Sequence, residues 1–212
     1  LLNKAKAGNA HLINSCIACN QACLDNIFKN KTATCLVNPR ACTEASLEIK
    51  IAQNQLNVAV VGGGVAGCSA ALTAAECGHR VTLYESESRL GGQFRLAMRI
   101  PGKSDYAETI RFFENALAHN NVQVRTNTHA DVAKLDGFDK VIIATGVLPS
   151  VPDLNRNMAC FPIIHYEEAL QIEDWKQYEN VCIIGGGGVA LDTALYIMND
   201  GKTGHISIQI WY

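Results

Sequence analysis

Two glycine-rich motifs, each placed between a short apolar run and a helix-like stretch, constrain the fold of this chain more than any other feature. The first follows the β-branched run 58–61 and opens the alanine-rich stretch 65–78, and it fits the pattern G-x-G-x-x-G. In such a strand–turn–helix unit, Gly62 permits a tight turn, Gly64 lets a diphosphate approach the backbone, and Gly67 lets the helix pack closely on the sheet. Backbone N–H groups at the start of the helix would bind the diphosphate. The motif therefore predicts a dinucleotide site.

The elements that follow this motif indicate an α/β fold. A second short strand is expected at 81–85, and a helix at 105–119 leads to strands at 122–124 and 140–144. Strands that alternate with helices build parallel sheets with helices on their faces. We therefore expect a Rossmann-like domain, a parallel sheet with flanking helices. Glu85, which ends the second strand, is placed to accept hydrogen bonds from ribose hydroxyls.

The second glycine motif repeats this pattern about 120 residues further on. It follows the apolar run 181–184 and fits G-x-G-x-x-A, with Gly185, Gly187 and Ala190 at the three key positions. Alanine in the last place is a common variant of the fingerprint. The segment 205–210 is either the next strand or the beginning of an insertion, and the chain ends just after it. The sequence thus predicts a second, truncated dinucleotide-binding unit.

Nine cysteines form the other unusual feature, and five of them lie in the first 42 residues. Four have the spacing C-x2-C-x3-C-x11-C, namely Cys16, Cys19, Cys23 and Cys35. Three thiolates from one loop and a fourth from a return segment suit a 4Fe–4S cluster. Structural zinc more often takes two separate C-x-x-C pairs, and zinc or a disulfide remains an alternative here. We expect the remaining cysteines to be ordinary buried thiols, with Cys42 near the site: Cys42, Cys68, Cys77, Cys160 and Cys182.

Composition excludes several classes of partner. The net charge is −2 and no basic cluster occurs, which argues against nucleic-acid binding. No apolar run approaches the roughly 18–20 residues of a membrane span. Residues 1–8 show no signal-peptide pattern, so the cysteine-rich segment indicates a cytoplasmic metal or cluster site. Because the first residue is not methionine, we expect a piece of a longer chain.

Two further segments resemble those of flavoproteins that bind two dinucleotides. Arg89-Leu90-Gly91-Gly92 after Glu85 is similar to the segment by which such proteins extend the FAD site, and Ala144-Thr145-Gly146 is similar to the crossover between their two domains. This resemblance implies FAD at the first glycine motif, with Gly92, Thr145 and Gly146 at the site. It also implies NAD(P)H at the second motif.

Longer stretches resemble the bacterial 2,4-dienoyl-CoA reductases (NADPH), which belong with trimethylamine dehydrogenase among the iron–sulfur relatives of old yellow enzyme. The matching stretches are 13–25, 35–42, 90–94 and 100–103. The resemblance implies a preceding TIM barrel that carries FMN, binds an acyl-CoA substrate and supplies the catalytic residues. It also implies an electron path from NADPH through FAD and the cluster to FMN, for reduction of a conjugated C=C bond. Intact G-x-G-x-x-A and Gln93 favour a reductase over an amine dehydrogenase of the same architecture. A non-catalytic nucleotide-binding module with zinc is a second alternative.

The same resemblance implies the role of individual residues. It makes Cys16, Cys19, Cys23 and Cys35 the cluster ligands. The residues that it brings to FAD are Ala66, Glu85, Gln93, Lys103 and Ala130. The expected domains are 1–56 (end of the barrel and iron–sulfur segment), 57–150 (first part of the FAD domain) and 151–212 (linker and start of the NADPH domain).

Overall fold

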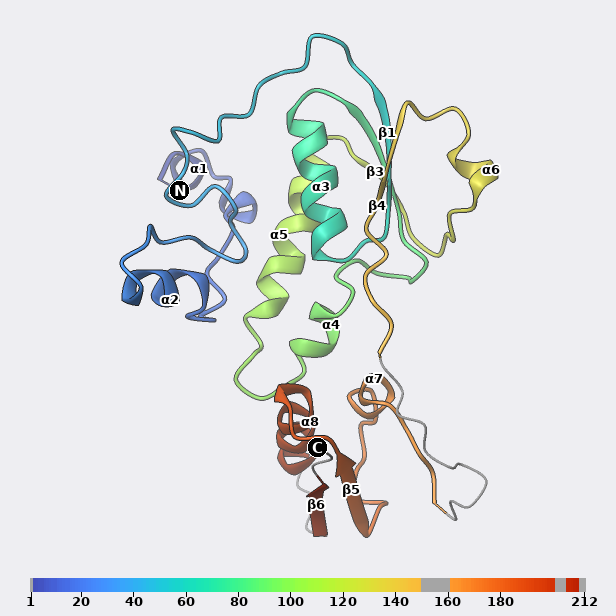
Figure 1. Cartoon of the computed structure of the whole chain (residues 1–212). Coiled ribbons are helices and arrows are strands. Elements are labelled where there is room, and N and C mark those ends of the chain that lie inside the picture. Colours follow the sequence, from blue (N-terminus) through green and yellow to red (C-terminus); the bar gives the residue numbers. More distant parts are fainter. Residues whose placement is uncertain (1, 150–160, 201–204, 210–212) are drawn as a thin grey trace. The chain divides into compact units, whose positions relative to one another are not determined.

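A computed structural model describes residues 2–149, 161–200 and 205–209 (Figure 1). The chain divides into two compact units, each described below by itself. The first unit contains the chain up to Phe94 together with Asp105–Gly146. The second contains Arg95–Ser104 together with the chain from Val147 onward.

The first unit is built on a four-stranded parallel sheet in the order β3-β2-β1-β4. These strands are β1 (Asn57–Val61), β2 (Arg80–Tyr84), β3 (Gln123–Arg125) and β4 (Lys140–Ile143). Helices α3 (Val65–Glu76) and α5 (Tyr106–His119) are the crossovers on one face of the sheet, and the short α6 (Val132–Leu135) lies on the other (Figure 1). The expected Rossmann-like fold is confirmed, and each predicted strand end lies within one residue of the observed end.

Apolar side chains between the sheet and its two long helices form the core of this unit. Val58 and Val60 of β1 are buried there with Leu83 of β2, because alternate side chains of a strand point to the same face. Phe113 and Leu117 of α5 are buried against them. The two central strands are thereby fixed, and their carboxyl ends define one edge of the sheet.

The cysteine-rich segment belongs to the same unit. It contains α1 (Leu2–Lys6), a 3-10 turn η1 (Ala10–Leu12) and α2 (Ala22–Phe28). Leu12 is 6% exposed and joins the core of the sheet unit, which anchors the segment.

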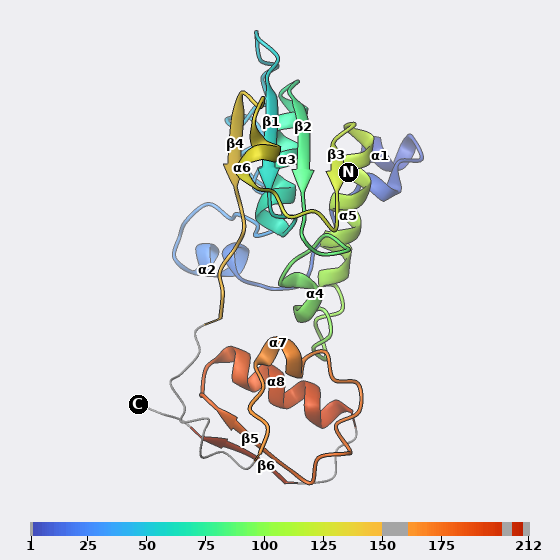
Figure 2. The ribbon, with the colours of Figure 1, turned by 90° about the vertical axis from the view of Figure 1, so that its right-hand side faces the viewer.

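The second unit pairs β5 (Asn180–Ile184) with β6 (His205–Gln209) in parallel, and α8 (Gly188–Asn199) connects the two strands (Figure 2). The short α7 (Tyr166–Ala169) contributes to a small core around Trp175 and Ile197. Of the two interpretations of segment 205–210, the strand is therefore correct for residues 205–209, and Ile210 lies outside the described residues.

Residues 1–56 group with the first unit, and segment 95–104, which belongs to the expected domain 57–150, groups with the second. Segment 95–104 contains most of the short helix α4 (Phe94–Ala97). Arg99 donates a hydrogen bond to the Tyr196 hydroxyl at 3.1 Å, and Lys103 forms an ion pair with Asp192 of α8. These polar contacts explain the grouping.

Among the described residues, no helix combines the length and apolar character needed to cross a bilayer. The expectation of buried thiols is right for Cys68 but wrong for Cys42 and Cys182, which are both exposed, and Cys77 is half-buried. Cys160 lies outside the described residues.

Candidate functional site

The first glycine loop is held by contacts that leave no room for side chains at two of its positions. Gly62 has a φ of +106°, and a Cβ added there would lie 2.3 Å from the Ala144 carbonyl oxygen. A Cβ added at Gly67 would lie 1.8 Å from the Gly62 carbonyl oxygen. The predicted roles of a tight turn and of close helix packing thus correspond to specific backbone contacts between β1, β4 and α3.

Gly64 differs from both, because it faces open space. It is the N-cap of α3 with an ordinary φ of −68°, and a Cβ added there would meet nothing within 4 Å. The first N–H groups of an α-helix have no acceptor within the helix, and glycine offers no capping side chain. The loop therefore leaves both space and donors for a diphosphate, so the residues fit the phosphate part of a dinucleotide.

Glu85 has a structural role that sequence reasoning missed. Its carboxylate is buried, and one oxygen accepts a hydrogen bond from the Gly63 N–H at 2.6 Å. The other oxygen accepts from the Glu87 N–H at 2.8 Å. The pairing of Val61 with Tyr84 places the ends of β1 and β2 side by side and makes this bond possible. Glu85 thus fixes the glycine loop, and its contact with ribose stays a prediction.

The glycine pair Gly91-Gly92 lies directly against the first glycine loop. Gly91 donates a hydrogen bond to the Gly63 carbonyl at 2.8 Å and forms a parallel bridge with Gly64. Gly92 has a φ of +48°, and a Cβ there would lie 3.1 Å from the Gly64 Cα. Gln93 follows as an exposed residue. The structure therefore brings this segment to the rim of the open space at Gly64.

The other residues expected at FAD divide into two groups. Ala66 is exposed in the first turn of α3, and Thr145 lies beside Gly62 at the end of β4, followed by Gly146 with a φ of +77°. The loop that carries Ala130 is tied to the end of β2, because Thr128 donates to the Glu85 carbonyl at 2.8 Å. These residues surround the same edge of the sheet.

Lys103 belongs to the second unit. Its ammonium lies 2.5 Å from the Asp192 carboxylate in the second unit, so its contact with FAD stays a prediction.

Cys68 is buried behind the glycine loop. Its thiol donates to the Gly63 carbonyl at 3.2 Å. Burial, with a smaller contribution from the Glu85 and Glu114 carboxylates, raises the pKa of this thiol to about 12. The thiol is therefore protonated near neutral pH and acts as a packing group, not a nucleophile.

The second glycine motif occupies the equivalent place in its own unit. Gly185 has a φ of +124°, and Gly187 is the N-cap of α8 with open space beside it. Ala190 is half-buried in the first turn. The strand–turn–helix arrangement expected of a dinucleotide motif is thus present here, with the carboxylate of Asp192 held by Lys103 near the helix start.

The four cysteines expected to bind a cluster lie on one segment, with Cys23 in helix α2 and the other three in the loops on either side of it. Cys16 is exposed, and Cys19, Cys23 and Cys35 are partly buried. In the part of the chain that the structure describes, no three His, Cys, Asp or Glu side chains meet around a common point, so the four thiols are not assembled as a ligand set. The ligand set therefore stays a prediction.

The donor chemistry of the loop nevertheless fits an iron–sulfur cluster. The Ala18 N–H donates to the Cys16 sulfur at 3.3 Å, and N–H···S bonds of this kind stabilise cluster thiolates. Ala18 and Asn20 both have a positive φ, so the backbone turns sharply between the first cysteines. Four thiols on a turning loop suit a soft metal centre.

Comparison with known proteins agrees with this geometry. The family model described as pyridine nucleotide-disulphide oxidoreductase matches residues 56–208. The chain is 37% identical over 204 residues to an NADH oxidase of Thermoanaerobacter brockii and 35% identical over 214 residues to a metal reductase of Desulforamulus reducens. These matches cover 93% and 95% of this chain and 31% of each relative.

A solved structure is also similar over almost the whole chain. It is a 2-naphthoyl-CoA reductase in complex with 2-naphthoyl-CoA, with a TM-score of 0.87 and 30% identity. The match covers 97% of this chain and 31% of that one, so the chain spans about a third of the length of its relatives. The glycine loops, the parallel sheets and the match over residues 56–208 show that the chain belongs to the pyridine nucleotide-disulphide oxidoreductase family.

Proposed function

We propose that this chain is the electron-transfer part of an iron–sulfur flavoenzyme. FAD would bind at the first glycine loop, NADPH at the second, and a 4Fe–4S cluster at Cys16, Cys19, Cys23 and Cys35. The observation that carries the proposal is the open space beside Gly64, at the edge where the carboxyl ends of β1, β2 and β4 meet. Dinucleotides bind at this edge of open α/β sheets.

The residues of the chain would supply binding and orientation. The first turn of α3 would donate N–H groups to the diphosphate, while Glu85 keeps the Gly63 peptide fixed beside it. The segment that begins at Gly92 would close over the open space. Bound FAD would accept electrons in pairs and release them singly, and the cluster would carry one at a time.

The proposed parent reaction is NADPH-dependent reduction of a conjugated C=C bond in an acyl-CoA, as in the 2,4-dienoyl-CoA reductases. FMN, the catalytic residues and the acyl-CoA site would lie on a barrel outside this chain. Similarity to a 2-naphthoyl-CoA reductase supports a CoA thioester substrate, and similarity to an NADH oxidase supports a nicotinamide donor. The described cysteines are all free, which supports a reducing cytoplasmic setting.

The cluster is tested by purifying or reconstituting the chain without oxygen and assaying iron and acid-labile sulfide. We expect both in the ratio of a 4Fe–4S cluster. Cys19→Ser should remove the brown colour and leave the far-UV circular dichroism unchanged. Cys182→Ser, which changes an exposed thiol on β5, is the matched control and should keep the colour. Stoichiometric zinc without sulfide would refute the proposal in favour of a zinc module.

A further inference from the structure

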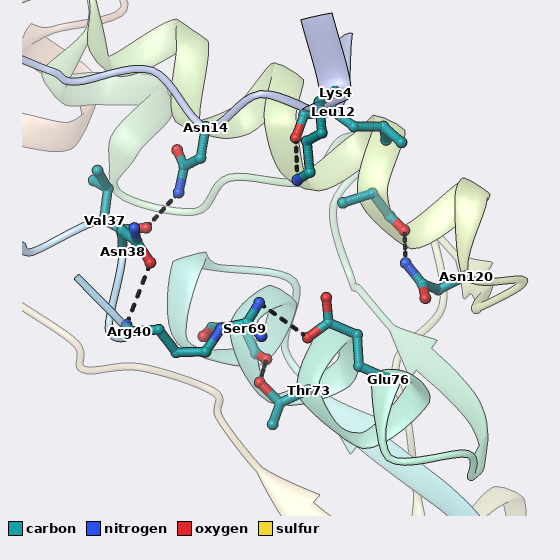
Figure 3. A network of polar contacts seen from close by, with 11 residues as sticks. Lys4, Leu12, Asn14, Val37, Asn38, Arg40, Ser69, Thr73, Glu76 and Asn120 are labelled. Carbon is teal, nitrogen blue, oxygen red and sulfur yellow. Dashed lines mark hydrogen bonds and ion pairs between the residues drawn. The ribbon is translucent and has the colours of Figure 1, made fainter. Parts of the chain in front are cut away.

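One side chain joins the two ends of the cysteine loop. Asn14 lies two residues before Cys16, and Val37 lies two residues after Cys35. The Asn14 side-chain N–H donates to the Val37 carbonyl at 2.5 Å, across 23 positions of the chain (Figure 3). All four expected ligands lie between these two residues. The hydrogen bond therefore closes the loop that carries them.

The side of the loop that contains Asn14 is itself fixed to the sheet unit. The Arg111 guanidinium of α5 donates to the carbonyl of His11 at 2.9 Å and to that of Ile13 at 3.2 Å. Its Nε is paired with Glu108 at 2.7 Å, which orients the guanidinium. Leu12, between the two bonded carbonyls, is buried in the core. Asn14 thus extends from a rigid backbone.

The other side of the loop has less support of its own. Arg40, three residues after Val37, reaches Glu76 of α3 at 3.4 Å, and both side chains are partly exposed (Figure 3). Asn14 and Val37 also line a cavity of about 930 Å³, so water can approach the segment after Cys35. An exposed ion pair holds a backbone only weakly. The hydrogen bond from Asn14 therefore fixes the position of the segment after Cys35 more closely than the ion pair of Arg40 with Glu76 does.

The side-chain oxygen of Asn14 indicates that the side chain is needed for its N–H group. Its side-chain oxygen is buried and has no hydrogen-bond partner among the described residues. Burial of an unpartnered acceptor is unfavourable, so an apolar residue of the same size would be better for packing alone. The hydrogen bond from the side-chain N–H, and not burial of the side chain, therefore explains asparagine at position 14.

We propose that Asn14 is a positioning residue, which holds Val37 against the start of the loop and so returns Cys35 toward Cys16, Cys19 and Cys23. This inference rests on the proposed function, because it assumes that the four thiols bind one cluster. A loop whose ends are already joined loses less chain entropy when it binds a metal. Without the bond, three ligands on one short stretch remain together, and the fourth is released.

Two substitutions of Asn14 test this role, with a matched control in the same loop. Asn14→Asp keeps the size and removes the donor, and Asn14→Leu removes the donor without adding charge. Asn26 also donates a side-chain N–H, to the Thr34 hydroxyl at 3.0 Å, but at an exposed position. Asn26→Asp is therefore the control, because Thr34 can donate to the new carboxylate.

Each variant is reconstituted anaerobically with iron and sulfide and examined by EPR in the oxidised state. We expect both Asn14 variants to lose roughly one iron in four and to give the signal of a 3Fe–4S cluster, which an oxidised 4Fe–4S cluster does not give. The Asn26 variant should match the wild type. Amide hydrogen exchange of the metal-free proteins adds a readout that needs no cluster, and residues 15–36 should exchange faster in the Asn14 variants only.

The outcomes separate this inference from the proposed function. A wild-type chain that takes up no iron and sulfide refutes the proposed function. A wild-type chain with a 4Fe–4S cluster, together with Asn14 variants that keep its iron content, EPR silence and hydrogen exchange, refutes the role of Asn14. An effect of Asn14→Asp without one of Asn14→Leu also refutes it, because the added charge and not the lost donor is then responsible.

Discussion

Two glycines of the first loop should respond differently to the same substitution. Gly67→Ala places a methyl group 1.8 Å from the Gly62 carbonyl oxygen and 3.0 Å from the carbonyl carbon, which are both backbone atoms. Helix α3 must then shift by more than about 1 Å within a close-packed core. We expect a loss of about 3 kcal/mol in the free energy of unfolding, the upper end of the range for overpacking.

Gly64→Ala adds the same methyl group where nothing lies within 4 Å and where φ is −68°. Alanine adopts this conformation readily, and the gain of about 0.4–1 kcal/mol from its stiffer unfolded chain is offset by its poorer capping of α3, so the stability should change little. The methyl group would nevertheless occupy the space that we assign to the diphosphate. The affinity for FAD should therefore fall at least about tenfold, a loss of about 1.4 kcal/mol in binding.

Urea unfolding followed by circular dichroism measures the first effect, and quenching of flavin fluorescence on titration with FAD measures the second. The reasoning fails if Gly64→Ala lowers the stability as Gly67→Ala does, because the space would then be needed for packing. It also fails if Gly64→Ala binds FAD as the wild type does, because the diphosphate would then lie elsewhere.

Three other substitutions test the remaining contacts. Glu85→Gln replaces one carboxylate oxygen by an NH₂ group, which cannot accept the hydrogen bond from the Gly63 or the Glu87 N–H. The free energy of unfolding, measured with a chemical denaturant, should fall by about 1–3 kcal/mol. The Cys68 thiol has its pKa raised from 9.0 to about 12, so the folded state holds its proton longer, and stability should fall as the pH rises from about 9 to 12. Cys68→Ala should remove that part of the pH dependence of urea unfolding. Lys103→Met should destabilise the second unit by about 1 kcal/mol in an Asp192 background and by much less in Asp192→Asn, a difference that a double-mutant cycle detects.

The sequence was most informative where the structure depends on local pattern. Strands β1 and β2 and helices α3 and α5 follow from apolar runs and from glycines at fixed spacing, and their observed ends differ from the predicted ones by at most two residues. The division of roles among Gly62, Gly64 and Gly67 is also local, because it depends on one turn between a strand and a helix.

Contacts that depend on strand register or on distant segments could not be predicted in this way. The bond from Gly63 to Glu85 exists because β1 and β2 pair with Val61 opposite Tyr84, which no spacing along the chain reveals. The ion pair of Lys103 with Asp192 joins positions 89 residues apart within the second unit, and no spacing along the chain reveals it.

The two glycine motifs share a sequence pattern, but glycine is required in them for different physical reasons. In the first loop, a Cβ at Gly62 would collide with the backbone of Ala144, just after β4, and a Cβ at Gly67 would collide with the backbone of Gly62. Glycine is therefore required there for stability alone. In the second, a Cβ at Gly187 or Gly188 would meet nothing within 4 Å among the described residues, and only the positive φ of Gly185 restricts the residue type. Packing within the described part therefore explains glycine at three positions of the first motif, since a Cβ at Gly63 would also lie 2.5 Å from the Leu90 side chain, and at none of the helix-start positions of the second. Glycine at Gly64 and at Gly187 has the same remaining explanation, an approach of another molecule to the backbone at the start of a helix.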